Sequence, residues 1–292
     1  MVYTLTNKLI KITIRSKGAE LISLKTLKPD LEYLWQPDNN SVWHAQSPIL
    51  FPIIGNLPND TYNFNNKSYY LTGHGFASQQ DFKLENRTDD TLSFSIQATA
   101  ETMEIYPFFF DLKVSYLIRD QSVTFQYKIK NTDTKIMYFS IGGHPGFRCP
   151  LMEQETYNDY KLYLAQTEKI DRIINQNGFL TGETEPFLNN ENMIDFSSIK
   201  LPRGQRVIIL KGLKSDQITL KSSKTNKGVT VQFSGFPYLG LWPIENNPLI
   251  CIEPWFGLST KSGIVCDLKH KQGIQNLSPG KEFNASFTVS VF

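Results

Sequence analysis

The chain contains little cysteine and no long apolar run. Its three cysteines, Cys149, Cys251 and Cys266, are an odd number without close spacing, which argues against a disulfide framework and a zinc knuckle. No stretch approaches the roughly 18 uninterrupted apolar residues of a membrane span, and the N-terminus lacks a cleavable apolar segment. These absences predict no membrane association and favour a reducing, cytoplasmic location.

Neither sign of charge dominates, because 30 basic residues face 28 acidic ones for a formal net charge of +2. The basic residues are scattered, with no basic run interleaved with aromatics, so we expect no nucleic-acid partner. The 40% hydrophobic and 13% aromatic content excludes a disordered chain. We expect residues 1–292 to form a single domain, as a monomer or homodimer, because large β-domains reach this length.

Helical periodicity is nearly absent, whereas alternation of apolar and polar residues is frequent. It marks strands at 10–14 and 92–96, hairpins at 110–131 and 217–235, and a closing strand at 283–292. Short helices are expected only at 100–105 and 166–174, and the polar stretch 184–200 is interpreted as a long surface loop. This pattern predicts an all-β fold, a large antiparallel sandwich or barrel.

Histidine is also scarce, and two of the four histidines are flanked by glycine, in GHG at His74 and GGHPG at His144. Backbone without side chains beside a histidine lets a ligand approach closely. The alternative is a turn histidine satisfied by nearby backbone. For His144, which directly follows a predicted strand, we favour the functional interpretation.

Glu253 lies within the apolar and aromatic run ICIEPWFG. Burying a carboxylate there is costly unless it is paired or functional, and such surroundings raise its pKa toward that of a general base. The alternative is a solvent-facing glutamate on an edge strand, which Pro254 would permit. Trp242 and Phe76 accompany these polar groups and offer aromatic faces to a ligand, although each taken singly is more typical of a core.

Four motifs together carry a family resemblance. HGFA begins at His74, GGHPGF at Gly142 and IEPWFG at Ile252, and all follow SPILFPIIG, which begins at Ser47. In this order and spacing they resemble the aldose 1-epimerase superfamily, and its LacX-like branch most closely. The resemblance implies a galactose mutarotase-like β-supersandwich that acts on a small sugar and needs neither metal nor cofactor.

The resemblance also implies roles for three residues. His144 corresponds to the general acid that protonates the ring oxygen, Glu253 to the base that accepts the C1 hydroxyl proton, and His74 to a second histidine that binds sugar oxygens. Opening an aldose ring requires these two proton transfers, and a histidine and a glutamate suit them near neutral pH.

Two departures from the family pattern bear on the substrate. Asn56 and Ser78 stand where many relatives carry arginine, the side chain best suited to phosphate. We therefore predict a neutral aldohexose, with Asn56 as a weaker substrate-binding amide. Two alternatives stay open: a hexose-6-phosphate 1-epimerase in which Arg148 supplies the charge, and a non-catalytic carbohydrate-binding or sensing protein. A glycoside hydrolase is disfavoured because Glu253 lacks an obvious carboxylate partner.

Overall fold

The computed structural model describes residues 1–292 except 42, 196–198, 200, 202–203, 244–247 and 264. The strands are β1 (Val2–Thr6), β2 (Ile10–Arg15), β3 (Glu20–Leu27), β4 (Asp30–Glu32), β5 (Ile49–Leu50), β6 (Thr61–Phe64), β7 (Lys67–Tyr70), β8 (Lys83–Arg87), β9 (Thr91–Gln97), β10 (Phe110–Arg119), β11 (Ser122–Asn131), β12 (Met137–Phe139), β13 (Ile141–Gly143), β14 (Gly146–Arg148), β15 (Tyr160–Gln176), β16 (Phe179–Ile194), β17 (Ile208–Lys211), β18 (Gln217–Ser222), β19 (Gly228–Gln232), β20 (Tyr238–Pro243), β21 (Leu249–Phe256), β22 (Gln275–Leu277) and β23 (Glu282–Val291). The helices are α1 (Ala100–Ile105) and the 3-10 turns η1 (Pro58–Asp60), η2 (Ala77–Gln79), η3 (Tyr157–Asp159) and η4 (Leu268–His270).

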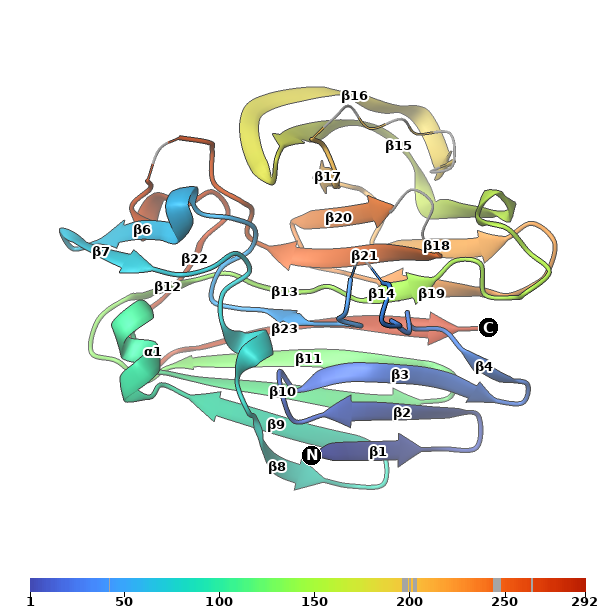
Figure 1. The fold of residues 1–292 in the computed structure, drawn as a ribbon, viewed down its shortest axis with the longest axis horizontal. Helices are drawn as coiled ribbons and strands as arrows, with labels where there is room; N and C mark the ends of the chain where they lie inside the picture. The colour runs from blue at the N-terminus through green and yellow to red at the C-terminus, as the bar shows by residue number, and fades with distance from the viewer. Residues whose placement is uncertain (42, 196–198, 200, 202–203, 244–247, 264) are drawn as a thin grey trace.

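The strands form one 15-stranded sheet and a four-stranded sheet, β1-β2-β3-β4, with two small two-stranded sheets. The large sheet follows the order β5-β13-β21-β20-β17-β15-β18-β19-β23-β11-β10-β9-β8, and its neighbouring strands pair antiparallel. Its two other strands lie off this path, β14 beside β21 and β16 beside β15. The four-stranded sheet lies beside its β9–β11 end (Figure 1), where Tyr116 donates its hydroxyl hydrogen to the carbonyl of Ala19 at 2.5 Å. The predicted all-β antiparallel sandwich is confirmed.

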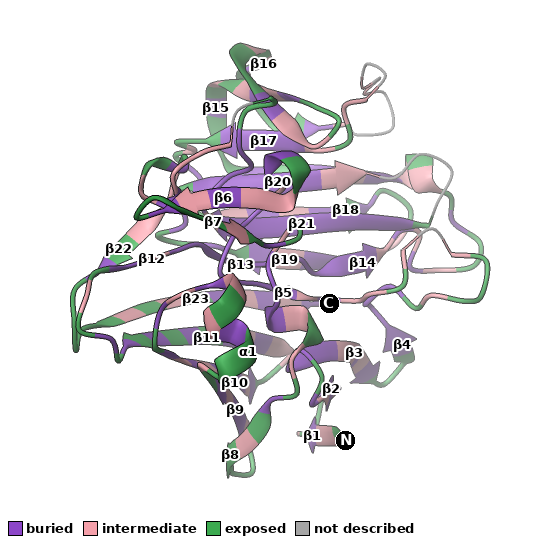
Figure 2. Cartoon of the chain, turned by 60° about the vertical axis from the view of Figure 1, so that its left-hand side comes forward, coloured by how far each residue is buried: buried purple, intermediate pink, exposed green. Residues whose placement is uncertain are grey.

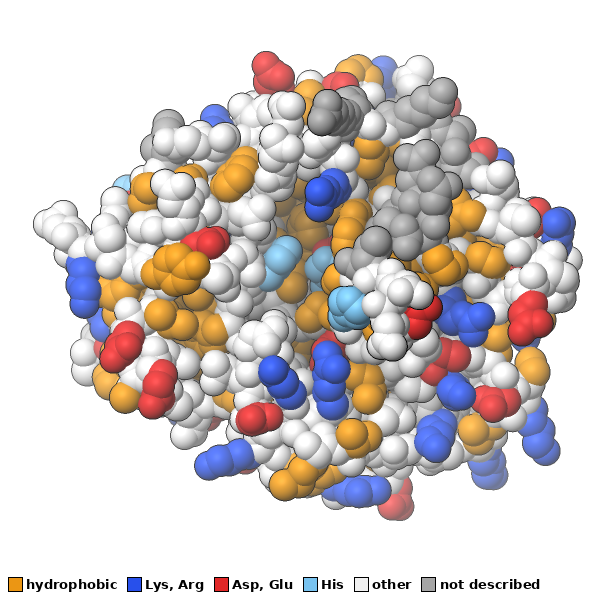
Figure 3. Space-filling view, viewed as in Figure 1, with side chains coloured by type: hydrophobic (Ala, Val, Ile, Leu, Met, Phe, Trp, Pro, Cys, Tyr) orange, Lys and Arg blue, Asp and Glu red, His pale blue; other side chains and the backbone are white. Residues whose placement is uncertain are grey.

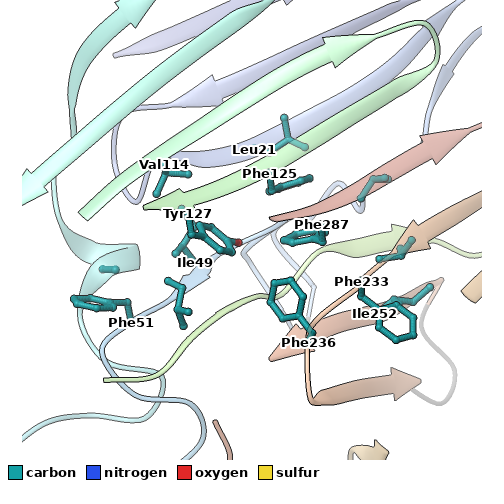
Figure 4. Packing of buried hydrophobic residues seen from close by; sticks show 14 of the residues in the cluster. Leu21, Ile49, Phe51, Val114, Phe125, Tyr127, Phe233, Phe236, Ile252 and Phe287 are labelled. Atoms are coloured by element: carbon teal, nitrogen blue, oxygen red, sulfur yellow. The ribbon is translucent and has the colours of Figure 1, made fainter. Parts of the chain in front are cut away.

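An aromatic core fills the space between the sheets. The period-2 pattern of β11 places alternate residues inward, among them Phe125 and Tyr127. Phe125 stacks on Phe287 of β23, with ring centroids 4.3 Å apart. Figure 4 shows Leu21 and Val114 packed above these rings. Figure 2 shows buried residues concentrated along the central strands, with exposed residues on the β15–β16 hairpin and the outer margins.

Two sequence-based expectations about local structure were wrong. Residues 166–174, expected as a short helix, lie inside β15, because Glu168 is buried and accepts hydrogen bonds from Ser215, which ties this segment to a neighbouring loop. The expected surface loop at 184–200 is strand as far as Ile194. An edge strand pairs on one side only, so β16 can keep polar side chains in solvent; residues 196–198 and 200 lie outside the described residues.

The helix expected at 100–105 is confirmed as α1. Thr99 caps it, because its hydroxyl accepts a hydrogen bond from the N–H of Thr102 while the Thr102 hydroxyl receives the Thr99 N–H. None of the helices in the described part of the chain has the length and apolar character that crossing a membrane requires.

Candidate active site

His144 and Glu253 meet where three strands of the large sheet converge. His144 lies between β13 and β14, both of which pair with β21, the strand that carries Glu253. The N–H of His144 donates to the carbonyl of Pro48 at 3.1 Å, and that of Ile252 to the carbonyl of Pro145 at 3.2 Å. This backbone framework leaves Nε2 of His144 and Oε2 of Glu253 3.2 Å apart. The pair that the sequence singled out is therefore adjacent in space.

Glu253 is fully buried, with no exposed surface. Its strand β21 lies between β20 on one side and β13 with β14 on the other, so Pro254 does not mark a sheet edge and the solvent-facing alternative is excluded. Alternation along β21 puts Cys251, Glu253 and Trp255 on one face. Apart from the contact of Oε2 with His144 and the nearby Trp255 side chain, the carboxylate oxygens of Glu253 have no hydrogen-bond partner among the described residues. A buried carboxyl with so few protein partners is poised to accept hydrogen bonds from a ligand.

Burial determines where the protons of this pair reside. It raises the pKa of Glu253 well above its ordinary value, an effect that the neighbouring Trp255 side chain partly opposes. Burial and then the nearby His74 lower the pKa of His144 to about 3. Both shifts favour a neutral imidazole beside a protonated carboxyl over an ion pair, because burial disfavours two separated charges.

Two tryptophans form the wall around His144. Trp43 stacks on its imidazole with ring centroids 5.1 Å apart, and Trp242 contacts it edge-on at 5.6 Å. The indole N–H of Trp35 donates to the carbonyl of Trp43 at 2.9 Å and fixes this loop. Sequence reasoning found Trp242 and missed Trp43, which stands only four residues before the SPILFPIIG motif. In Figure 3, histidine side chains gather in a hollow near the centre of the face, with hydrophobic side chains around them.

His74 adopts a left-handed backbone conformation (φ 64°), with Gly75 (φ 74°) directly after it. A Cβ atom on Gly75 would lie 2.3 Å from the carbonyl oxygen of Phe51, so the turn requires glycine there. This turn brings the ring of His74 within 5.8 Å of the ring of His144. Burial and then the charge of Lys271 lower the pKa of His74 to about 4, so both histidines are neutral near pH 7.

Asn56 lies beside this turn, and its side-chain amide fills the space between two glycines. A Cβ atom at Gly73 would come within 2.4 Å of Oδ1, and one at Gly178 within 2.2 Å of Nδ2. Gly178 belongs to the Asn177–Gly178 turn at the tip of the β15–β16 hairpin, and Ser259 anchors this tip by donating to the Gly178 carbonyl at 2.6 Å. The helix expected at 166–174 concealed this hairpin, although the Asn-Gly dipeptide is a strong hairpin-turn signal.

Phe76 is buried, and its ring centroid lies 6.0 Å from that of Phe51 and 6.0 Å from that of Phe110. These contacts anchor the HGFA turn in the core, and the predicted substrate contact of Phe76 stays a prediction. Ser78, whose missing guanidinium entered the substrate argument, lies in η2 with its carbonyl oxygen 2.8 Å from the point where Gly18 would carry a Cβ.

Arg148 lies at some distance from the pair. It pairs with Leu249 in the β14–β21 ladder, four residues along β21 from Glu253. At about 3.3 Å per residue this separates the two backbones by about 13 Å.

One group of described residues has the donor types of a metal site. The ligand atoms of His144, Cys251 and Glu253 lie within 4.8 Å of one another. Burial raises the pKa of the Cys251 thiol well above its ordinary value, which opposes formation of the thiolate that would bind a metal.

Comparison with known proteins places these features in a family. A family model described as Aldose 1-epimerase matches residues 1–290. The chromosomal protein LacX of Lactococcus lactis subsp. lactis is 35% identical over 301 residues, which cover 100% of this chain and 99% of that protein.

Solved structures agree with this similarity. A galactose mutarotase related enzyme from Lactobacillus acidophilus matches with a TM-score of 0.93 and 32% identity, over 100% of this chain and 97% of that one. A galactose mutarotase-like protein from Lactobacillus casei ATCC 334 matches with a TM-score of 0.91 and 30% identity, over 100% of both chains. The similarity therefore extends over the whole chain in both sequence and fold.

Proposed function

Because the chain belongs to the aldose 1-epimerase family, we propose that it interconverts the α and β anomers of a neutral aldohexose. Catalysis is by general acid and base, with His144 and Glu253 as the catalytic residues. The observation that carries this proposal is the 3.2 Å contact between Nε2 of His144 and Oε2 of the fully buried Glu253. No metal or cofactor takes part in the proposed reaction.

The proton count of the pair fits the reaction. Ring opening moves one proton from the C1 hydroxyl to a base and delivers one to the ring oxygen. The pair as a whole holds one transferable proton, which burial places on Glu253 in the structure. Polar groups of a bound sugar stabilise the ionic form, so that His144 takes this proton and becomes the acid while Glu253 becomes the base. Ring closure on the other face reverses both transfers and returns the pair to its starting state.

The surroundings suit a sugar. The indole rings of Trp43 and Trp242 stand around His144 and offer apolar surface to the C–H face of a pyranose. His74, next to His144, and the half-buried Asn56, beside the His74 turn, supply polar groups for sugar hydroxyls. Neither side chain carries a permanent charge, which supports a neutral aldohexose over a sugar phosphate.

The test is the rate of anomer exchange on freshly dissolved α-D-galactose and α-D-glucose, followed by polarimetry or saturation-transfer NMR. We expect the wild-type protein to accelerate exchange and both His144→Ala and Glu253→Gln to lose most of it, because each group contributes about 10²- to 10⁴-fold. His270→Ala, at an exposed histidine in η4, is the matched control and should keep full activity.

Two results would contradict the proposal. Saturable sugar binding without anomer exchange would favour the non-catalytic carbohydrate-binding alternative. A far higher kcat/KM for glucose 6-phosphate than for glucose would overturn the neutral substrate and bring Arg148 back as a candidate for phosphate recognition.

A further inference from the structure

Lys271 is a buried lysine whose described partners are carbonyl groups. Only 3% of the residue is exposed, and it directly follows η4. Its Nζ donates to the carbonyl oxygen of Ile54 at 2.8 Å and to that of Leu258. Burying an ammonium group against neutral acceptors is costly, so a function near this position would account for a lysine there.

The carbonyl of Ile54 belongs to the peptide group that holds His74. The N–H of the same peptide, on Gly55, donates to Nδ1 of His74 at 3.3 Å. In a trans peptide the C=O and N–H point in opposite directions, so Lys271 and His74 bind its two ends. The result is a continuous chain from the ammonium through one peptide group to the imidazole. Hydrogen bonds in such a chain polarise one another, and a cation at the oxygen strengthens the N–H donor.

This arrangement selects one form of the imidazole. Because Nδ1 accepts a hydrogen bond, the proton of the neutral ring must reside on Nε2. The backbone N–H of His74 also donates to the carbonyl of Gly55, in the next peptide, at 3.0 Å, which holds the backbone of His74 beside this segment. The positive charge of Lys271 acts in the same direction, since it disfavours a second proton on the ring.

We propose that Lys271 is a positioning residue that holds His74 as the neutral Nε2–H tautomer through the Ile54–Gly55 peptide. His74 then serves the reaction as a hydrogen-bond donor to a sugar oxygen, while proton transfer is left to His144 and Glu253. The part played in the reaction rests on the proposed function, whereas the tautomer itself does not.

A purely structural role for Lys271 makes different predictions. Leu258 follows β21 by two residues, so the ammonium also ties the end of that strand to the segment containing Ile54. If this clamp were its whole role, replacement would lower stability and leave the His74 tautomer unchanged. Burial lowers the pKa of Lys271 to about 7, an effect that Cys266 partly opposes, so the ammonium form prevails below neutral pH, where the measurements are made. Among the titratable groups described around Lys271, His74 and Cys266 face it.

The decisive measurement is two-bond ¹H–¹⁵N correlation NMR of the imidazole of His74, assigned by its loss in His74→Gln. We expect the Nε2–H pattern in the wild-type protein. In Lys271→Met we expect a mixture of tautomers and a higher pKa of His74, because the cation and the polarised donor are gone. Lys269→Met is the matched control: Lys269 lies in η4 and donates to Oδ1 of Asn65 on the surface, so its loss should change neither property.

Two results would overturn the proposal. An Nδ1–H pattern in the wild-type protein refutes it directly, even if Lys271→Met fails to fold. An unchanged tautomer and pKa of His74 in a folded Lys271→Met variant refute the role of the lysine.

The kinetic consequence is measured separately. Folded Lys271→Met should lose about 10- to 100-fold in kcat/KM, since misplacement of a group near the reacting atoms costs this much, and Lys269→Met should match the wild-type protein. A folded Lys271→Met variant with wild-type kcat/KM would refute the role in the reaction. A wild-type protein without epimerase activity would instead count against the proposed function and leave the NMR result standing.

Discussion

Glu253→Gln should remove catalysis and yet change stability in a way that depends on pH. Burial raises the pKa of Glu253 in the folded state, whereas the unfolded chain returns it to about its ordinary value of 4.5. Between these two values the folded state binds one proton more than the unfolded state. The stabilising contribution of this group is therefore fully present below pH 4.5 and declines as pH rises toward the folded pKa.

The size of this pH dependence follows from the one extra proton that the folded state binds. The free energy of unfolding falls by about 1.4 kcal/mol per pH unit while the difference is a whole proton. The wild-type protein should therefore lose stability from this group as pH rises from 4.5 toward the folded pKa, at up to this rate. Glutamine does not titrate, so Glu253→Gln lacks this loss and gains relative to the wild-type protein by the same amount.

Denaturant unfolding of both proteins at several pH values between 5 and 7 measures this difference. Other groups titrate in both proteins and cancel in the comparison. Glu183→Gln, at an exposed carboxylate, should show no such slope and serves as the control. A stability difference between Glu253→Gln and the wild-type protein that stays constant with pH would mean that Glu253 is ionised in the folded state. The proton placement argued for the pair would then be wrong.

Two further predictions concern the turn and the histidines. Because the pKa values of His144 and His74 lie at about 3 and 4, kcat/KM should stay level from pH 6 to pH 5 and fall only in more acidic solution; a fall of kcat/KM between pH 6 and pH 5 would contradict this. Gly75→Ala should lower the free energy of unfolding by about 3 kcal/mol or more, from strain and a clash with Phe51, against about 1 kcal/mol for Gly235→Ala, where φ is also positive but no atom lies within 4 Å. Equal losses would show that the close contact at Gly75 is relieved at little cost.

Much of the fold could be read from local patterns. Alternation along 110–131 predicted the β10–β11 hairpin, and its turn lies between Arg119 and Ser122 as expected. The pattern failed where tertiary contacts override local preference. Residues 166–174 contain well-spaced apolar and charged residues, but backbone pairing and the buried Glu168 hold them in β15. No local signal reveals a hydrogen bond to a loop 47 residues away.

The residues of the candidate site likewise fall into those that the sequence marked and those that only the structure revealed. Glycine-flanked histidines and a glutamate in an apolar run identified His144, His74 and Glu253 from residue types alone. Phe76 was assigned to the site because it belongs to the HGFA motif, but the direction of a side chain depends on the turn that carries it. Trp43 and the hairpin tip at Gly178 were missed because they reach the site from distant parts of the chain.

The sequence by itself determined the class of fold and the family and singled out His144 and Glu253, because these depend on periodicity and on residue types in ordered motifs. Only the tertiary structure showed that the two residues are adjacent and how burial shifts their pKa values, since these shifts depend on how far the folded chain excludes water around them. It also decided the neighbourhood of Lys271. No sequence pattern connects Lys271 to Ile54, 217 residues away, and only folding brings this ammonium to the peptide that holds His74.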